Sequence, residues 1–191
     1  MNYTTIRETA SLEYGMNFCS RCAAQTHPTI PANDNRLRHV CTKCGAIHYE
    51  NPKLVVGTVA YFNDKVLLCR RAIEPRSGKW TLPAGFMELN ETTQEGALRE
   101  TLEEAGAQVR PIKLMAVYDV VVANQVHLFY LAEMASESLD PGEESLEARL
   151  FYEHEIPWDE IAFRSVEAAL RHFLKDRQVH YSLPVDHQSM R

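Results

Sequence analysis

Residues 85–107, GFMELNETTQEGALRETLEEAGA, carry the strongest structural signal in this chain. The acids Glu100, Glu103 and Glu104 are spaced i, i+3 and i+4, which places three carboxylates on one face of a helix. Like charges at this spacing repel by roughly 0.2–0.5 kcal/mol per pair on an isolated helix. We therefore expect a compensating cation, and an all-oxygen ligand set favours Mg²⁺ or Mn²⁺.

The helix that carries these acids has recognisable ends. Thr92 or Thr93 is a suitable N-cap, and Gly106 is a suitable C-cap. We expect the face opposite the acids to pack against the core through Leu98, Thr101, Leu102 and Ala105. The alternative is an ordinary glutamate-rich surface helix, in which Arg99 and Glu103 form an i,i+4 ion pair on a solvated face.

Seven positions of the segment combine a fixed residue type with a fixed spacing: Gly85, Glu91, Arg99, Glu100, Glu103, Glu104 and Gly106. This pattern resembles the Nudix box of hydrolases that act on nucleoside diphosphates linked to another moiety. Thr101 departs from the pattern, because the family usually has an aliphatic residue there. The resemblance implies a Nudix α/β/α sandwich with a mixed sheet, and hydrolysis of a pyrophosphate bond by a metal-activated water.

The resemblance also implies which groups hold the catalytic Mg²⁺ or Mn²⁺. By position in the box, Glu100 and Glu104 are the principal ligands, and Glu103 joins them or acts through water. The backbone carbonyl of Ala84 or Gly85 is a further candidate ligand. All of these groups are oxygen donors, which both ions prefer.

Two further roles follow from the resemblance. Arg99 would form a salt bridge with Glu91 that fixes the helix to the preceding loop and aims the ligand carboxylates. Family members also often use an acid from outside the box as metal ligand or general base. Glu147 is the first candidate here and Glu144 the second, and the alternative for both is a solvated acidic loop.

Candidate substrate contacts lie just before and inside the box. Phe86 occupies the position where related NADH pyrophosphatases place an aromatic ring against a base, although a core position is the alternative. Trp80 is expected in the core. Arg70 and Arg71, and also Arg76, could contact phosphate groups or could be solvated surface charges.

Four of the five cysteines form two Cys-x-x-Cys pairs, Cys19 with Cys22 and Cys41 with Cys44, separated by eighteen residues. This spacing predicts a zinc ribbon, and four thiolates leave zinc no open position, so the ion should be structural. Two disulfides or two redox pairs are the alternatives. They are less favoured because no secretion signal is evident and one metal explains both pairs. Cys69 lies in an apolar run and is expected to be buried.

The four-cysteine ribbon ahead of a Nudix box is similar to NADH pyrophosphatases. Residues 18–165 more closely resemble plastid-type FAD pyrophosphatases and their bacterial relatives, through FCSRC (18–22), IHYENP (47–52), LCRRA (68–72) and KWTLPAGF (79–86). NADH pyrophosphatases carry an SQPWPFP-type array after the box, whereas this chain has VYDVVVANQ at 117–125. A proline common in this region of ADP-ribose hydrolases is also missing.

The expected reaction is therefore hydrolysis of FAD to FMN and AMP. Tyr118, Asn124 and Gln125 are candidates for polar contacts to a flavin or adenine. The close alternative is an ADP-ribose or NADH pyrophosphatase with a broad dinucleotide range. The distant alternative is a non-catalytic nucleotide sensor that contacts a partner through the ribbon.

Composition and charge narrow the class of protein further. The chain of 191 residues has a formal charge of −6, which argues against broad electrostatic binding to nucleic acid. A ribbon that recruits RNA or a protein partner is one interpretation. The charge weighs against the RNA version, so we expect a scaffold or dimerisation role for the ribbon and a homodimer as the assembly. No apolar run is long enough to span a bilayer and the first residues resemble no targeting signal, so we expect a cytoplasmic protein.

The expected organisation is a flexible N-terminus (1–16), a zinc ribbon (17–50), a Nudix domain (51–176) and a C-terminal tail (177–191). Strands are predicted at 54–62, 65–70, 108–122, 126–134 and 148–152, the first two as a hairpin. A final helix is predicted at 164–175, with Val166, Ala169, Leu170 and Phe173 facing inward.

Overall fold

The computed structural model describes residues 16–178 and 185–190. The expected flexible N-terminus, except Met16, lies outside these residues. The chain forms two compact units, of which the first ends at Asn51 and the second begins at Pro52. Within the described parts, no helix is long and apolar enough to cross a membrane.

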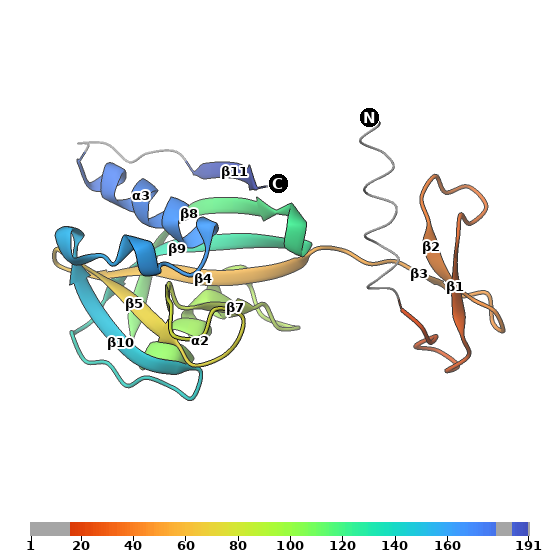
Figure 1. Ribbon diagram of the computed structural model, residues 1–191, viewed down its shortest axis with the longest axis horizontal. Helices are drawn as coiled ribbons and strands as arrows, with labels where there is room; N and C mark the ends of the chain where they lie inside the picture. The colour runs from red at the N-terminus through yellow and green to blue at the C-terminus, as the bar shows by residue number, and fades with distance from the viewer. Residues whose placement is uncertain (1–15, 179–184, 191) are drawn as a thin grey trace. The chain divides into compact units, whose positions relative to one another are not determined.

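The first unit is a small antiparallel sheet of three strands in the order β1-β2-β3, shown in Figure 1. The strands are β1 (Thr26–Thr29), β2 (Arg38–Cys41) and β3 (Ile47–His48). Two tight turns carry the cysteine pairs, and each contains a residue with positive φ: Ala23 at +57° and Gly45 at +68°. The sheet thus brings the two pairs, which are distant in sequence, to one place.

The second unit is a mixed sheet in the order β10-β5-β4-β9-β8-β11, with β6 paired to β5 and β7 to β4. Strand β4 runs parallel to β9, and β11 runs parallel to β8. The strands are β4 (Lys53–Phe62), β5 (Lys65–Arg71), β6 (Trp80–Thr81), β7 (Ala84–Phe86), β8 (Val109–Val120), β9 (Gln125–Met134), β10 (Ser145–Tyr152) and β11 (Asp186–Met190).

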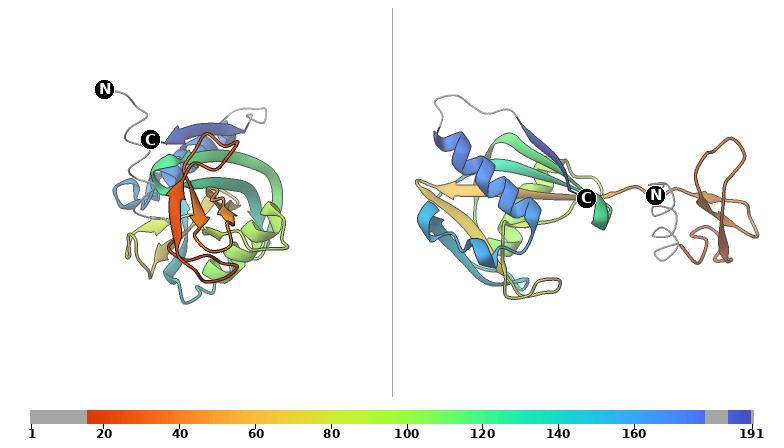
Figure 2. Two further views of the ribbon diagram at one scale, coloured as in Figure 1. Left: turned by 90° about the vertical axis from the view of Figure 1, so that its right-hand side faces the viewer. Right: turned by 45° about the horizontal axis from the view of Figure 1, so that its top comes forward.

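Two α-helices cover opposite faces of this sheet, α2 (Thr93–Ala105) and α3 (Arg164–Gln178), as Figures 1 and 2 show. Three short 3₁₀ turns complete the unit: η1 (Val121–Ala123), η2 (Glu153–Glu155) and η3 (Trp158–Glu160).

Alternation along β4 explains why both faces are covered. Thr58 faces α2, because its hydroxyl lies 2.7 Å from the hydroxyl of Thr101. Val59 points the other way, into the core cluster that contains Phe173 of α3. Successive side chains of a strand face opposite sides of the sheet, so one buried apolar strand supplies two cores. The predicted α/β/α sandwich is confirmed.

The predicted core stripe of α2 is wrong at Leu102. This side chain is 51% exposed, whereas the carboxylate residue Glu104 is only 8% exposed. The buried residues of the helix are Gly96, Ala97, Thr101, Glu104 and Ala105. The helix therefore packs on the sheet through small residues that allow close approach, and one acid lies at the centre of that face rather than opposite it.

The predicted hairpin of β4 and β5 is confirmed, with Phe62 opposite Lys65 across the turn. The inward face of α3 is also confirmed, because all four residues predicted there are buried. Strand β11 was not expected. Its sequence DHQSM has no apolar alternation, and it forms only because the edge of β8 accepts it in parallel register, a pairing with no local signal.

Gly57 allows β7 to approach β4, and replacing it with alanine is expected to destabilise the fold. A Cβ at Gly57 would lie 2.4 Å from both the Pro83 carbonyl oxygen and the Ala84 Cβ. Neither atom belongs to a flexible side chain, so the backbone must shift, at a cost of about 1–3 kcal/mol. Urea unfolding of Gly57→Ala checks this. Gly78→Ala is the contrasting variant: it also loses a glycine, but nothing lies within 4 Å of its added Cβ and the strain there comes only from φ of +79°.

Candidate active site

Local capping interactions fix helix α2 at both ends. The Thr92 hydroxyl accepts a hydrogen bond from the Glu95 backbone N–H at 3.2 Å, and the Thr92 N–H donates to Glu95 Oε2 at 2.7 Å. Gly106 ends the helix with φ of +64°, and its N–H donates to the Leu102 carbonyl. Both predicted ends are confirmed. The capping box and the glycine together fix where the helix begins and ends.

Thr101, the departure from the box pattern, packs against the sheet as expected. Its hydroxyl donates to the Ala97 carbonyl at 2.7 Å and pairs with Thr58. A buried hydroxyl with two partners carries no desolvation penalty from an unsatisfied group. Thr101 therefore packs against the sheet in place of the usual aliphatic residue.

The Arg99 guanidinium binds the carboxylates of Glu91, Glu100 and Glu103. Its guanidinium donates two hydrogen bonds to Glu91, at 2.8 and 3.0 Å, so the predicted salt bridge is confirmed and is bidentate. It also donates to Glu100 at 2.7 Å, to Glu103 at 2.9 Å and to the Phe86 carbonyl at 3.2 Å. The guanidinium lowers the pKa of Glu91 to about 2. The planar guanidinium of Arg99 thus links helix α2 to the loop that precedes it.

Two glycines provide the space that the carboxylates occupy. A Cβ at Gly85 would lie 2.3 Å from Glu100 Oε2, and a Cβ at Gly96 would lie 2.6 Å from Glu91 Oε1. The Glu100 carboxylate is therefore seated directly on the backbone of β7. Gly96 was not singled out from the sequence, since a glycine inside a helix gives no signal of what approaches it.

Glu104 is the most buried acid of the helix. The Ala84 backbone N–H donates to its Oε2 at 3.3 Å. Burial raises the pKa of Glu104 to about 8, and the charges of Glu100 and Glu144 add to this, while Arg71 opposes it. Burial likewise raises the pKa of Glu100, against the hydrogen bond from Arg99. A buried and a half-buried carboxylate, both with raised pKa values, form a site where positive charge is favoured.

The donor set fits a divalent cation that needs few protein ligands. Glu100 and Glu104 offer carboxylate oxygens on adjacent turns beside β7. Glu103 is instead 57% exposed at its side chain and paired with Arg99. In the described part of the chain, the four cysteines are the one group of three or more His, Cys, Asp or Glu residues whose ligand atoms all lie within 4.8 Å of each other. Mg²⁺ usually keeps several waters and takes only one or two carboxylates, so the pair suits it.

The two acids predicted from outside the box lie differently. Ala148 is opposite Cys69, and Cys69 faces α2, because its thiol contacts the Glu104 carbonyl oxygen at 3.9 Å. The neighbouring residue Glu147 therefore lies on the other face of the sheet. Glu144, in contrast, is near enough to raise the pKa of Glu104 and Glu100. The strand alternation thus places Glu147 away from the acidic pair, whereas Glu144 acts on that pair through its charge.

The C-terminal end of α2 is covered by a segment that the sequence did not point out. The Asp140 N–H donates to the Ala105 carbonyl at 2.8 Å, and the Gly142 N–H donates to the Glu104 carbonyl at 3.3 Å. A Cβ at Gly142 would lie 2.0 Å from the Glu103 carbonyl oxygen. These contacts hold Asp140 and Gly142 against the C-terminal end of the acidic helix. The Pro141-Gly142 pair was the available signal of a tight turn.

The predicted arginines lie on the strand that leads to the site. Arg70 donates to the Gly78 carbonyl at 3.0 Å. Arg71 donates to the Pro75 carbonyl at 2.9 Å, and its guanidinium lies 5.2 Å from the centre of the Phe163 ring. Both side chains hold the 72–79 loop, and Arg71 also acts on Glu104 through its charge.

The two predicted aromatic residues have different surroundings. Trp80 is buried and packs edge-on against Phe151, which confirms its core position. Phe86 is 48% exposed, and the Lys53 ammonium lies 5.0 Å from its ring centre.

Tyr118, a candidate for substrate contact, is fully buried. Its hydroxyl donates to Asp186 of β11, a partner that no local pattern could reveal.

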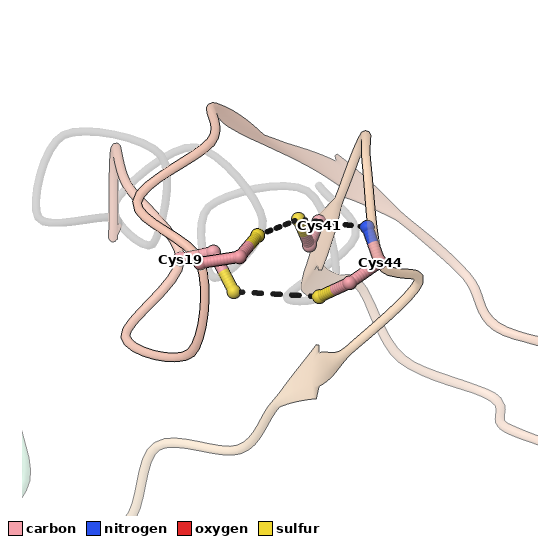
Figure 3. A group of neighbouring side chains, drawn as sticks. Cys19, Cys41 and Cys44 are labelled. Atoms are coloured by element: carbon pink, nitrogen blue, oxygen red, sulfur yellow. Dashed lines mark hydrogen bonds between the residues drawn. The ribbon is translucent and has the colours of Figure 1, made fainter.

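The four cysteines of the first unit form the second candidate site (Figure 3). Cys19 Sγ lies 3.7 Å from Cys44 Sγ, and Cys22 Sγ lies 3.5 Å from Cys41 Sγ. Tetrahedral zinc with Zn–S bonds of about 2.3 Å requires sulfur atoms about 3.8 Å apart, so the group fits zinc. The backbone N–H groups of Cys44 and Lys43 donate to Cys41 Sγ and lower the pKa of its thiol. The predicted alternative of two disulfides is not seen, since all five cysteines are free.

We expect Arg99→Lys to lower kcat by about 10–100-fold, the usual effect of losing a group that orients metal ligands. Lysine keeps the charge but cannot contact Glu91 through two nitrogens while also reaching Glu100. Steady-state kinetics with Mg²⁺ measure the effect. Arg110→Lys is the matched control, because Arg110 forms an exposed pair with Glu133 away from the box. Equal activity of both variants would contradict the orienting role of Arg99.

Comparison with known proteins agrees with the fold and with both sites. The NUDIX domain model matches residues 51–176, and the model described as Nudix N-terminal, a zinc ribbon, matches residues 17–50. A crystal structure of a NUDIX hydrolase from Nitrosomonas europaea is 46% identical, with a TM-score of 0.86 over 92% of this chain and 100% of that one. The chain belongs to the NUDIX domain family.

Two named relatives are more distant. An NAD-capped RNA hydrolase NudC from Vibrio atlanticus is 28% identical over 138 residues, which cover 69% of this chain and 49% of that protein. An ADP-ribose pyrophosphatase from Methanocaldococcus jannaschii is 27% identical over 113 residues, which cover 57% of this chain and 67% of that protein. The chain thus spans about half the length of the NudC relative.

Proposed function

We propose that this protein is a divalent-cation-dependent pyrophosphohydrolase that cleaves the P–O–P bond of a nucleoside diphosphate linked to a second moiety. The supporting observation is the pair of half-buried Glu100 and buried Glu104, both seated against β7, with Glu100 oriented by Arg99. One water is consumed, one P–O bond is broken, and two phosphate monoesters are released. Family membership supports the reaction class.

The bound cation would lower the pKa of its water and neutralise charge on the phosphoryl oxygens. Residues of this chain would position the cation and its bound water. Glu100 and Glu104 hold the cation, with the Ala84 carbonyl as a further donor, and Glu103 contributes through water. Arg99 holds the Glu100 carboxylate in position, because the same guanidinium is also bound to Glu91. Burial of the pair strengthens its interaction with the cation, because little water competes there.

The acid outside the box is proposed to be Glu144. We expect Glu144→Gln to lower kcat by about 10²–10⁴-fold, the contribution of a general base, and Glu147→Gln to leave kcat within about twofold. The two variants make the same change three residues apart in one acidic stretch, so they control for each other. The reverse order of effects, measured with Mg²⁺ at saturating substrate, would return the role to Glu147.

FAD is the proposed substrate, with FMN and AMP as products. The resemblance of residues 18–165 to FAD pyrophosphatases supports this, together with the missing SQPWPFP array. ADP-ribose and NADH are the alternatives; the name of the pyrophosphatase relative favours ADP-ribose, and the NudC relative is named for NAD-capped RNA. Phe86, with Lys53 beside it, is the proposed surface for a flavin or adenine ring, and stacking contributes about 1–3 kcal/mol per base. Arg70 and Arg71 are the proposed phosphate contacts.

A panel of FAD, NADH, ADP-ribose, diadenosine polyphosphate and NAD-capped RNA tests the proposal, with AMP or 5′-phosphate release measured against Mg²⁺ concentration. FAD should give the highest kcat/KM. A higher value for another substrate would reassign the substrate and keep the reaction. Tight binding of the panel without turnover of any member would support the sensor alternative and overturn the enzymatic proposal.

The remaining proposals concern the assembly. The zinc ion of the ribbon is proposed to be structural, because four thiolates complete its coordination. We further propose a homodimer in the cytoplasm, with the ribbon as the dimerising element. Sedimentation of the wild-type chain at several concentrations tests the dimer.

A further inference from the structure

A groove of about 380 Å³ is lined by residues of α3 and β11. Helix α3 covers the face of the sheet opposite α2 (Figure 1). This volume is in the range of small-molecule sites. Strand β11 lines the groove with Asp186, Gln188 and Met190, which alternation places on one face of the strand. The box acids lie on the other side of the sheet, so the groove is separate from the candidate active site.

The helix side of the groove carries a row of cations. Arg164, Arg171 and Lys175 are spaced i, i+7 and i+11, which places them on one stripe of α3. Arg171 and Lys175 are also i and i+4, a spacing at which like charges repel. Concentrated positive charge of this kind is unexpected on a chain of net charge −6. A bound anion would relieve the repulsion.

Two of these cations have no counter-ion among the described residues. Within residues 16–178 and 185–190, neither Arg164 nor Lys175 forms an ion pair, whereas Arg171 pairs with Glu167 at 2.8 Å. The guanidinium of Arg171 also lies 4.4 Å from the centre of the Trp158 ring, which fixes its position. A held guanidinium beside an unpaired ammonium is an arrangement suited to a doubly charged anion.

The acids of the groove are already engaged. Asp186 accepts hydrogen bonds from the Tyr118 hydroxyl and from the Gln188 amide, both at 2.8 Å. Glu167 is held by Arg171. The groove therefore offers an anion the ammonium of Lys175 beside the guanidinium of Arg171, which is shared with Glu167, and Ala168 and Met190 give it an apolar wall.

We propose that this groove binds a small organic phosphate monoester, with the phosphate between Arg171 and Lys175. A phosphate dianion matches the fork of the arginine and the point charge of the lysine, and the apolar wall receives the organic part. The proposed reaction releases two such monoesters, so a product is one source of the ligand. The site itself rests on the groove residues and not on that reaction.

Isothermal titration of the full chain, zinc-loaded and without added Mg²⁺ or Mn²⁺, tests the proposal. AMP, FMN, inorganic phosphate and adenosine are the probes. We expect AMP and FMN to bind, inorganic phosphate to bind more weakly, and adenosine not to bind. Inorganic phosphate binding as tightly as the monoesters, or adenosine binding as tightly as AMP, would overturn the assignment of the ligand class. No binding of any probe at millimolar concentration would overturn the site.

Substitutions in and outside the groove test where AMP binds. Lys175 is exposed and has no ion pair among the described residues, so Lys175→Gln should fold normally and weaken AMP binding by about tenfold, the loss of one charge-assisted hydrogen bond. Glu167→Gln should strengthen binding, because it removes the acid that competes for Arg171. Arg36→Gln, a matched loss of one exposed cation in the ribbon, should change nothing. AMP binding that survives Lys175→Gln but is lost in Glu104→Gln would place the ligand at the box and overturn the proposal.

Discussion

Replacing Glu104 with glutamine is expected to lower kcat by about 10²–10³-fold, the effect of removing one electrostatic stabiliser of a transition state. Glutamine is nearly isosteric, so it keeps the shape of the site, but its amide has no charge to hold a divalent cation. The side chain is 8% exposed and in contact with the Ala84 N–H, so no water or neighbouring acid can take its place. Steady-state kinetics over a range of Mg²⁺ concentrations measure the loss.

The same variant is expected to be more stable than the wild-type protein when Mg²⁺ is absent. The pKa of Glu104 is raised from 4.5 to about 8 in the folded protein, chiefly by burial. As the pH rises from 4.5 to 8, the unfolded chain ionises this carboxyl readily while the folded one resists, so wild-type stability falls. Glutamine does not titrate and removes this penalty, which is on the order of a few kcal/mol at pH 8.

Thermal melting at pH 4.5 and pH 8 separates these effects. The two proteins should melt together at the lower pH, and the variant should melt higher at the upper pH. Leu102→Gln is the matched control, since it introduces the same side chain on the exposed face of the same helix. Retained turnover in Glu104→Gln, with the stability difference present, would show that Glu104 is buried for structure alone.

Some features of α2 could be predicted because their signals are local. Thr92, Glu95 and Gly106 set the ends of the helix through contacts within a few residues. The rotation of the helix could not be predicted in the same way. Hydrophobic periodicity assigns Leu102 to the core, whereas the structure exposes it and buries Glu104. A buried acid contradicts the local rule, as is expected where the residue serves a site rather than the fold.

Other features depend on contacts between segments far apart in the chain. The face on which Glu147 lies is set by an irregularity in the pairing of β10 with β5, between Ser145 and Glu147. A bulge of this kind shifts every following side chain by one position, and no sequence pattern announces it. Strand β11 is similar, since a polar pentapeptide becomes a strand only when the β8 edge is available. Both the outer acid and the α3–β11 groove therefore became visible only in three dimensions.

Replacing Cys41 with serine is expected to abolish zinc binding and unfold the ribbon. Structural zinc contributes about 10–16 kcal/mol of binding free energy in small zinc-finger domains, and this energy is folding energy. The ribbon has little else to stabilise it, because its buried apolar cluster consists of Cys19, Cys41 and Ala46. A serine hydroxyl does not replace a thiolate, and the chain should change from about one bound zinc ion to a small fraction of that.

Metal analysis and limited proteolysis measure the two parts of this expectation, zinc content and cleavage within residues 17–50. Cys69→Ser is the matched control. It makes the same substitution in the buried β5 strand of the second unit, outside the ribbon. This control should keep its zinc and its protease resistance. A Cys41→Ser chain that retains stoichiometric zinc would show that three thiolates suffice. One that loses zinc but resists proteolysis would show that the ribbon folds by its sheet alone.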